Sequence, residues 1–185
     1  MGEQHKKHSR REHLNDFHLN VAGEYVYDGA LYACQNDDAK QRRSKRAVWG
    51  MAAILTVAVA AGGCIPAPGM QHCFYVLLPY LGEFLGAASV IWALAKLGMD
   101  WGTVREYNYK KSVAVLPVRT AVTAVFSGLG IVCELIFFFV NDHAGQTFFA
   151  LLYVLLKLIA LLSVLVLRAE IMQAEWDKLP KKNNF

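Results

Sequence analysis

The sequence lacks the short motifs by which common enzyme classes are recognised. It contains no phosphate-binding glycine loop, no dinucleotide fingerprint, no metallopeptidase motif and no nucleophile with a recognisable partner base. The histidines near its start do not have the spacing of metal ligands on a helix. We therefore predict a protein that is not an enzyme and that uses neither a metal nor another cofactor.

Charged residues are almost absent from four long apolar stretches, and this scarcity excludes an ordinary soluble domain. Hydrophobic residues make up 55% of the chain, and the mean hydropathy is +0.28. A helix crosses the apolar core of a bilayer, about 30 Å thick, with roughly 20 residues. The sequence therefore predicts an all-α integral membrane protein, a four-transmembrane-helix bundle with short outer loops and spans at about 47–64, 73–97, 113–140 and 147–167.

Lysine and arginine are missing from the two short loops that follow the first and third spans. Of the 19 such residues, Arg119 and Lys157 lie deep within spans, and Lys96 lies at the inner end of the second span, beside the central loop. The others lie before the first span, between the second and third, or after the last. Cytoplasmic loops of membrane proteins are enriched in these residues. We therefore expect both termini in the cytoplasm, a location in the plasma membrane and contact with membrane lipid. The net charge of +4 then needs no nucleic-acid partner.

Polarity divides the chain into three regions. Residues 1–46 are predicted to be a basic cytoplasmic tail, mostly disordered. Residues 47–168 are predicted to be the membrane domain. Residues 169–185 are predicted to continue as a cytoplasmic C-terminal helix, which Pro180 ends, and a tail.

The tail contains two weak structural patterns. The first is a helical spacing of apolar residues that allows one short amphipathic helix on the membrane surface, held there by the basic run KQRRSKR; its members are Leu14, Phe17, His18 and Val21. A disordered tail with a chance spacing is the alternative. The second is the segment GEYVYDGALY, whose alternating tyrosines and two glycines favour a short extended stretch or a pair of turns.

Only four cysteines occur, and two of them, Cys64 and Cys73, bracket the first outer loop. Disulfides persist outside the cell, so this pair is predicted to form one if the loop folds inward to bring the Cα atoms within about 7 Å. Two free thiols are the alternative. A thiol–disulfide function at the outer face is a further hypothesis, although the pair lacks close C-x-x-C spacing and a second outer pair.

Four acidic or basic residues lie deep inside the predicted spans, away from their ends: Glu83, Arg119, Glu134 and Lys157. Charges at this depth are costly and mark candidate functional sites. Glu83 and Lys157 each lie about ten residues from the outer end of a span, and this equal depth predicts an ion pair near the midplane. Glu134 is shallower, and Arg119 is close enough to the inner end to extend toward the cytoplasm. The alternatives are a transport site and a contact with another subunit.

Small residues follow one face of the second span. They are Gly82, Gly86, Ser89 and Ala93. Such faces let helix backbones approach closely. The pattern predicts helix packing, either within one chain or between two copies.

Nearly all polar sequence is predicted to be cytoplasmic, and the outer loops are short for a receptor. The sequence therefore favours a non-enzymatic accessory, regulatory or scaffolding component of a membrane complex, with a protein partner or as a homo-oligomer. The alternative is a small oligomeric transporter in which Glu83 binds a proton or cation and Lys157 releases it.

Overall fold

Long helices dominate the structure. The computed structural model describes residues 17–19, 23, 25–27, 29–98, 101–141 and 147–179, and it is mostly helical. Within these residues four helical segments are long and apolar enough to cross a membrane, as predicted. Their long helices are α2 (Asp38–Cys64), α4 (Phe74–Leu97), α6 (Leu116–Val140) and α7 (Thr147–Met172).

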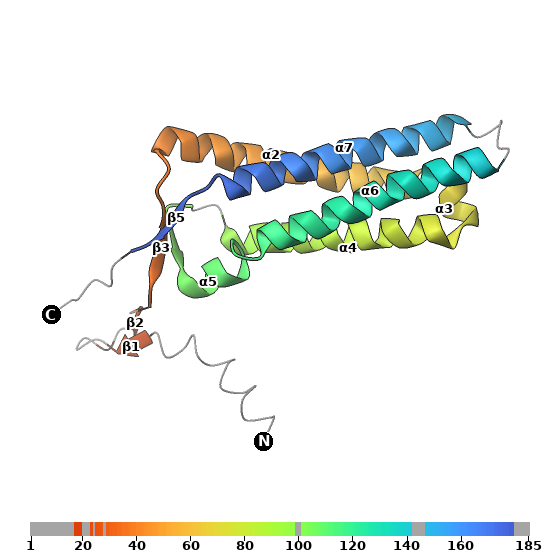
Figure 1. The fold of residues 1–185 in the computed structure, drawn as a ribbon. Coiled ribbons are helices and arrows are strands. Elements are labelled where there is room, and N and C mark those ends of the chain that lie inside the picture. The colour runs from red at the N-terminus through yellow and green to blue at the C-terminus, as the bar shows by residue number, and fades with distance from the viewer. Residues whose placement is uncertain are drawn as a thin grey trace, which may run out of the picture.

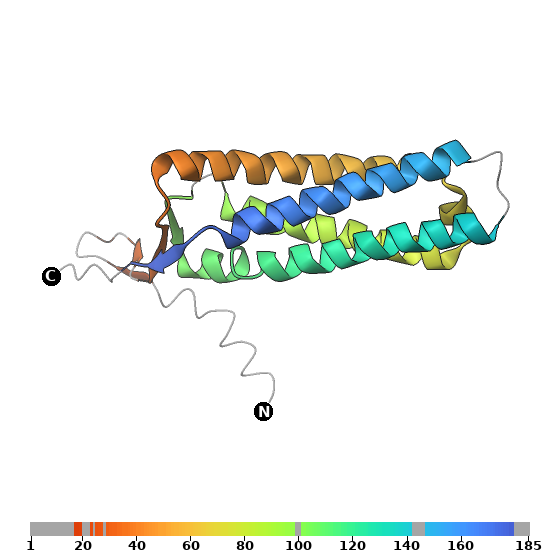
Figure 2. The same cartoon turned by 45° about the horizontal axis from the view of Figure 1, so that its top comes forward.

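The four helices lie side by side, and two short helices join their ends (Figures 1 and 2). Helix α7 packs against α2 and α6, and α4 packs against α6 and α2. Helix α3 (Pro68–His72) connects α2 to α4, and α5 (Glu106–Lys111) precedes α6. We call the end that carries α3 the α3 end.

Helix α6 has its polar side chains inside and its apolar side chains outside. The buried residues recur every three or four positions: Leu116, Thr120, Thr123, Ser127, Gly130, Glu134 and Phe137. The exposed side is aliphatic, with Val118, Val122, Val125, Leu129, Val132 and Ile136. This pattern is the reverse of a soluble amphipathic helix and suits a helix whose outer side contacts lipid.

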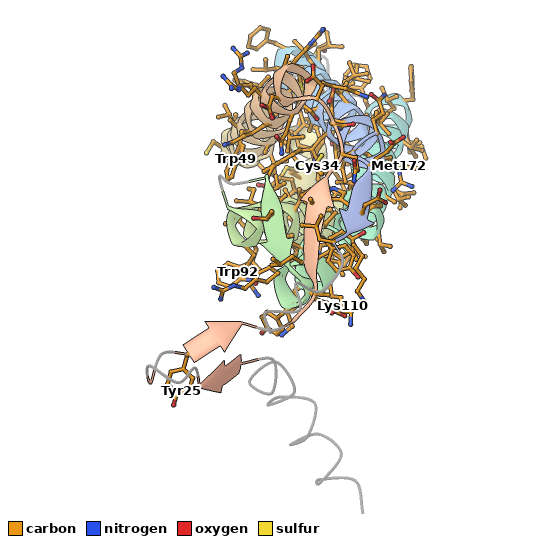
Figure 3. The ribbon with its side chains drawn as sticks, turned by 90° about the vertical axis from the view of Figure 1, so that its left-hand side faces the viewer. Tyr25, Cys34, Trp49, Trp92, Lys110 and Met172 are labelled. Carbon is orange, nitrogen blue, oxygen red and sulfur yellow. The ribbon has the colours of Figure 1, made fainter. Side chains whose placement is uncertain are left out.

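A small antiparallel sheet lies at the opposite end of the helices, which we call the sheet end (Figure 1). Its strands are β3 (Leu31–Cys34), β4 (Thr103–Arg105) and β5 (Trp176–Lys178), in the order β4-β3-β5. Figure 3 shows β3 between the other two. In the central strand Tyr32 is opposite both Val104 and Lys178. The sheet therefore joins segments that precede α2, precede α5 and follow α7.

Aromatic side chains fill the space between this sheet and the helices. The rings of Tyr32 and Tyr109 stack with centroids 4.1 Å apart, and Trp176 lies 6.4 Å from Trp101 and 6.0 Å from Tyr109. Trp101 is buried and belongs to the apolar cluster that also contains Val48 and Leu167. The sheet end is thus packed onto the helices and shares a core with them.

The amphipathic helix predicted for the tail is not formed at Phe17–Leu19. These residues are strand β1, which pairs antiparallel with β2 (Tyr25–Tyr27). Gly23 has a positive φ of 79°, a conformation that glycine adopts readily and that suits a chain reversal. The other two apolar positions of that pattern, Leu14 and Val21, lie outside the described residues. The extended stretch predicted within GEYVYDGALY is present as β2 and β3.

Several predicted boundaries differ from the structure. Helix α2 begins at Asp38, inside the region predicted as a tail, because Asp37 and Asp38 place negative charge at its N-terminus and favour the helix dipole. Helix α6 begins at Leu116, later than predicted, and Pro117 occupies its first turn, where no backbone donor is needed.

The helix predicted for the C-terminal region is only partly present. Helix α7 ends at Met172, and β5 follows. The backbone there bonds with β3, since Gln35 N donates to Glu175 O at 3.0 Å and Leu179 N donates to Leu31 O at 2.8 Å. These strand bonds replace the helical ones, and Trp176 gains its place in the aromatic core. Pro180, the predicted helix end, lies outside the described residues.

Candidate functional site

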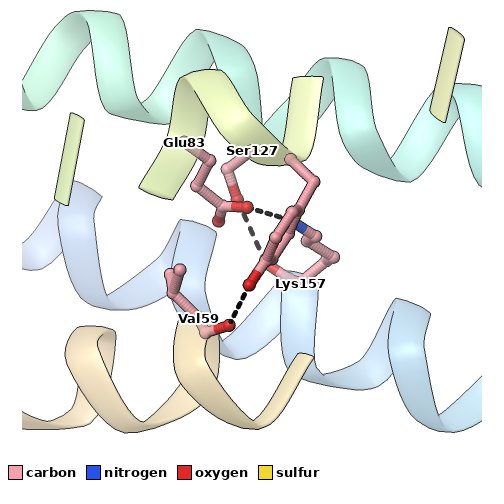
Figure 4. Close-up of polar contacts among 5 residues, drawn as sticks. Val59, Glu83, Ser127 and Lys157 are labelled. Carbon is pink, nitrogen blue, oxygen red and sulfur yellow. Dashed lines mark hydrogen bonds and ion pairs between the residues drawn. The ribbon is translucent and has the colours of Figure 1, made fainter. Parts of the chain in front are cut away.

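A buried ion pair joins α4 to α7 in the middle of the helices. Lys157 Nζ contacts Glu83 Oε2, with 3% and 0% of the two side chains exposed (Figure 4). The ammonium also lies 4.6 Å from the ring centroid of Tyr80 and 5.2 Å from that of Tyr153. Gly130 of α6 lies beside the lysine stem, and a Cβ there would be in ordinary van der Waals contact with Lys157 Cε at 3.6 Å. Lys157 is therefore enclosed by the neighbouring helices.

Most hydroxyl groups around this pair are satisfied by backbone carbonyls. Ser127 Oγ donates to Lys157 O at 3.3 Å, and Tyr80 OH donates to Val59 O at 3.3 Å, which links α4 to α2 (Figure 4). Further along α6, Thr120 and Thr123 donate to carbonyls of their own helix at 2.9 and 2.8 Å. These groups act as ordinary structural polar residues.

Glu134 is the exception among the buried polar residues of α6. It is fully buried, and neither carboxyl oxygen has a hydrogen-bond partner within the described part of the chain. Tyr153 OH and Glu83 Oε1 also lack partners there. Glu134 and Tyr153 both lie about 9 Å from the α3 end of their helices, at six residues and 1.5 Å each. We call Tyr80, Glu83, Glu134, Tyr153 and Lys157 the buried cluster. It contains two carboxyl groups but a single ammonium, that of Lys157.

Helix α3 covers the cluster at the α3 end. Ala67, Pro68 and Gly69 are buried against the ends of the long helices. A Cβ at Gly69 would overlap Glu134 Oε2 and would lie 3.1 Å from Val76 Cγ2. Glycine is therefore the residue that lets α3 sit directly on the Glu134 carboxyl group.

Arg119 lies apart from the cluster, closer to the sheet end. Its guanidinium donates to Ser89 O at 2.7 Å, and no carboxylate of the described residues forms an ion pair with it. The contact ties α6 to α4 and requires no second subunit.

The face of small residues on α4 packs within the chain. A Cβ at Gly82 would lie 2.5 Å from the Phe126 ring, and one at Gly86 would lie 2.5 Å from Thr123 Oγ1. Ser89 donates to Gly86 O at 2.8 Å, and Ala93 is fully buried. The close approach therefore occurs between α4 and α6.

All four cysteines lie in the described ranges, and each is a free thiol. Cys64 is exposed and Cys73 is half-buried at the α3 end, whereas Cys34 lies in β3 and Cys133 in α6. The disulfide between Cys64 and Cys73 stays a prediction. In the described part of the chain, no group of three or more His, Cys, Asp or Glu residues is placed to hold a metal ion.

Sequence reasoning missed Tyr80 and Tyr153 as members of the buried cluster, and Gly69 as the residue that lies on it. Tyr153 precedes Lys157 by one helical turn, so its place on the same face could have been found from spacing. Gly69 gave no such signal, because its role depends on how the loop folds over α6.

No known protein family matches this chain, and comparisons with curated proteins and with solved structures give no match either.

Proposed function

We propose that the protein is a non-enzymatic accessory or scaffolding component of a membrane complex. It spans the plasma membrane as a four-helix bundle with both termini in the cytoplasm, and its sheet end binds a protein partner. The observation that supports this proposal is the sheet itself, because β3, β4 and β5 gather the N-terminal, central and C-terminal polar segments into one folded surface.

The sheet end has features that suit protein binding. Strand β5 pairs with β3 on one side, and among the described strands none pairs with its other side. The free side of an edge strand can accept an extended segment of another protein. Asp177 and Lys178 of β5 are exposed and add charge to this edge. The aromatic core beneath keeps the edge in place.

Site-specific cross-linking tests the proposed partner surface. A photo-reactive amino acid in place of Lys178 is expected to capture one main partner in native membranes, because Lys178 lies on the free edge. The matched control is the same group at Phe74, which is 80% exposed at the α3 end. Capture of the same protein from both positions, or of only a second copy of this chain from Lys178, would contradict the proposal.

Native cysteines test the proposed orientation. Variants that keep only Cys64 or only Cys34 carry one thiol at the α3 end or at the sheet end. A membrane-impermeant maleimide added to intact cells is expected to label Cys64, whereas Cys34 is labelled only after the membrane is opened. The reverse pattern would place the basic sheet end outside the cell.

A transporter is the second candidate, and the unpaired Glu134 favours it, since a structural role leaves this buried carboxyl group unexplained. Neutralising Glu83 or Glu134 would then abolish flux in liposomes while leaving partner capture at Lys178 intact. If the protein is an accessory component, liposomes that contain the unchanged protein are expected to show no flux, and neither change alters that result.

A further inference from the structure

The buried cluster holds one carboxyl group more than its ammonium can neutralise. Lys157 is committed to Glu83, with which it forms the ion pair. Glu134 lies near enough to Lys157 and Tyr153 to interact electrostatically, yet it bonds to neither of them. A bare carboxylate buried without a donor is among the most costly groups that a protein can contain. One further positive charge is therefore needed at Glu134.

A proton can supply this positive charge while requiring fewer ligand groups from the protein than a metal ion does. In the described part of the chain, no group of three or more metal-ligand residues includes Glu134, and no cation pairs with its carboxyl group. The backbone N–H of Gly69 lies near this carboxyl group, but it carries no charge to neutralise it. A metal ion needs several oxygen ligands at fixed distances, whereas a proton needs only the carboxyl oxygen itself. Protonation also turns one oxygen into a donor, for which Tyr153 at the same depth offers an acceptor.

We propose that Glu134 is a proton-binding site, which holds one proton inside the membrane and exchanges it with the medium at the α3 end when α3 moves aside. The site is independent of the proposed partner surface, which lies at the opposite end of the helices.

The titratable groups around Glu134 come from each element that packs near it. Helix α4 contributes Tyr75 and Glu83, helix α7 contributes Tyr153 and Lys157, and Cys73 and Cys133 lie nearby. Lys157 is the cation of this group, and Glu83 neutralises it. The proton therefore binds at Glu134, where no cation is in contact.

Helix α3 provides the route to the medium. It is short, it follows the exposed Cys64, and it contacts α6 and α7 through buried small residues. Because Gly69 lies on Glu134 Oε2, a movement of α3 uncovers the carboxyl group without separating the long helices.

Infrared spectroscopy of the purified full-length protein in lipid tests the site. The C=O stretch of a protonated carboxyl group is expected at pH 7 and is expected to disappear in Glu134→Gln. The matched control is Glu83→Gln/Lys157→Met, which removes the other buried carboxyl group together with its counter-charge and should keep the band. Transfer to D₂O should shift the band, and Gly69→Ala should make that shift faster.

Three results would overturn proton binding at Glu134. The first is the absence of a band at pH 7, and the second is its loss in the Glu83 double variant and not in Glu134→Gln. The third is a band that sodium ions abolish at constant pH, which would assign Glu134 to an alkali-metal ion. A band that never shifts in D₂O would overturn exchange through α3 and leave a permanently sealed acid.

A second measurement needs no variant. A lipophilic carbodiimide reacts with protonated carboxyl groups, and mass spectrometry locates the adduct. We expect it on Glu134 at neutral pH and less of it at high pH. An adduct on Glu83 in place of Glu134, or none on either together with no infrared band, would contradict the proposal.

Discussion

Glu83→Gln alone is expected to lower the free energy of unfolding by about 3 to 5 kcal/mol, because it leaves the Lys157 ammonium buried without a counter-charge. Lys157→Met should cost a similar amount by leaving the Glu83 carboxylate unpaired. The two side chains are 0% and 3% exposed, so solvent offers little compensation. Thermal unfolding of each variant in one detergent measures the loss as a lower melting temperature.

The double variant Glu83→Gln/Lys157→Met tests whether the single variants lose stability because one charge is left buried without its partner. Replacing both members of a buried ion pair by uncharged residues is often nearly neutral, so the double variant is expected to recover most of the stability. Exchanging the residues, as Glu83→Lys/Lys157→Glu, should also recover part of it. If Glu83→Gln is as stable as the parent protein and instead loses an ion flux, the pair serves transport.

The location of this ion pair could be reasoned from sequence because helix geometry is regular. A constant rise of 1.5 Å per residue converts position along a span into depth, and Glu83 and Lys157 have nearly equal depths. Depth does not say which way a side chain points around the helix. The depth of Glu134 could be estimated in the same way. Its lack of a partner, however, depends on how α3, α6 and α7 pack together, which the sequence does not show.

The sheet could not be predicted by the same reasoning. Its strands have three or four residues each, too few for an alternating pattern to stand out from chance. Strand β5 also begins soon after the end of the long helix α7, so the helical period of α7 predicts a helix there. What decides the strand is its pairing with β3, which lies more than 140 residues earlier in the chain. Pairings between such distant segments leave no local signal.

The contact between α4 and α6 leads to the second large effect. Gly86→Ala would place a Cβ 2.5 Å from Thr123 Oγ1 and 3.3 Å from Thr123 Cα. Thr123 cannot move its Cα without moving α6, so the two helices must separate. Overpacking of this kind costs about 1 to 3 kcal/mol. The same change at Gly82 should cost less, because its near neighbour is the Phe126 ring, which can rotate.

Gly128 provides the matched control on α6, since a Cβ there meets nothing within 4 Å. Alanine is the better helix former by about 0.5 to 1 kcal/mol, so Gly128→Ala is expected to be neutral or stabilising. The order of melting temperatures should therefore be Gly128→Ala at or above the parent protein, then Gly82→Ala, then Gly86→Ala. Equal stability of all three would show that α4 and α6 are farther apart than this packing requires. If the protein forms a dimer and Gly82→Ala or Gly86→Ala dissociates it without lowering the melting temperature, the small-residue face would instead be assigned to a contact between two copies.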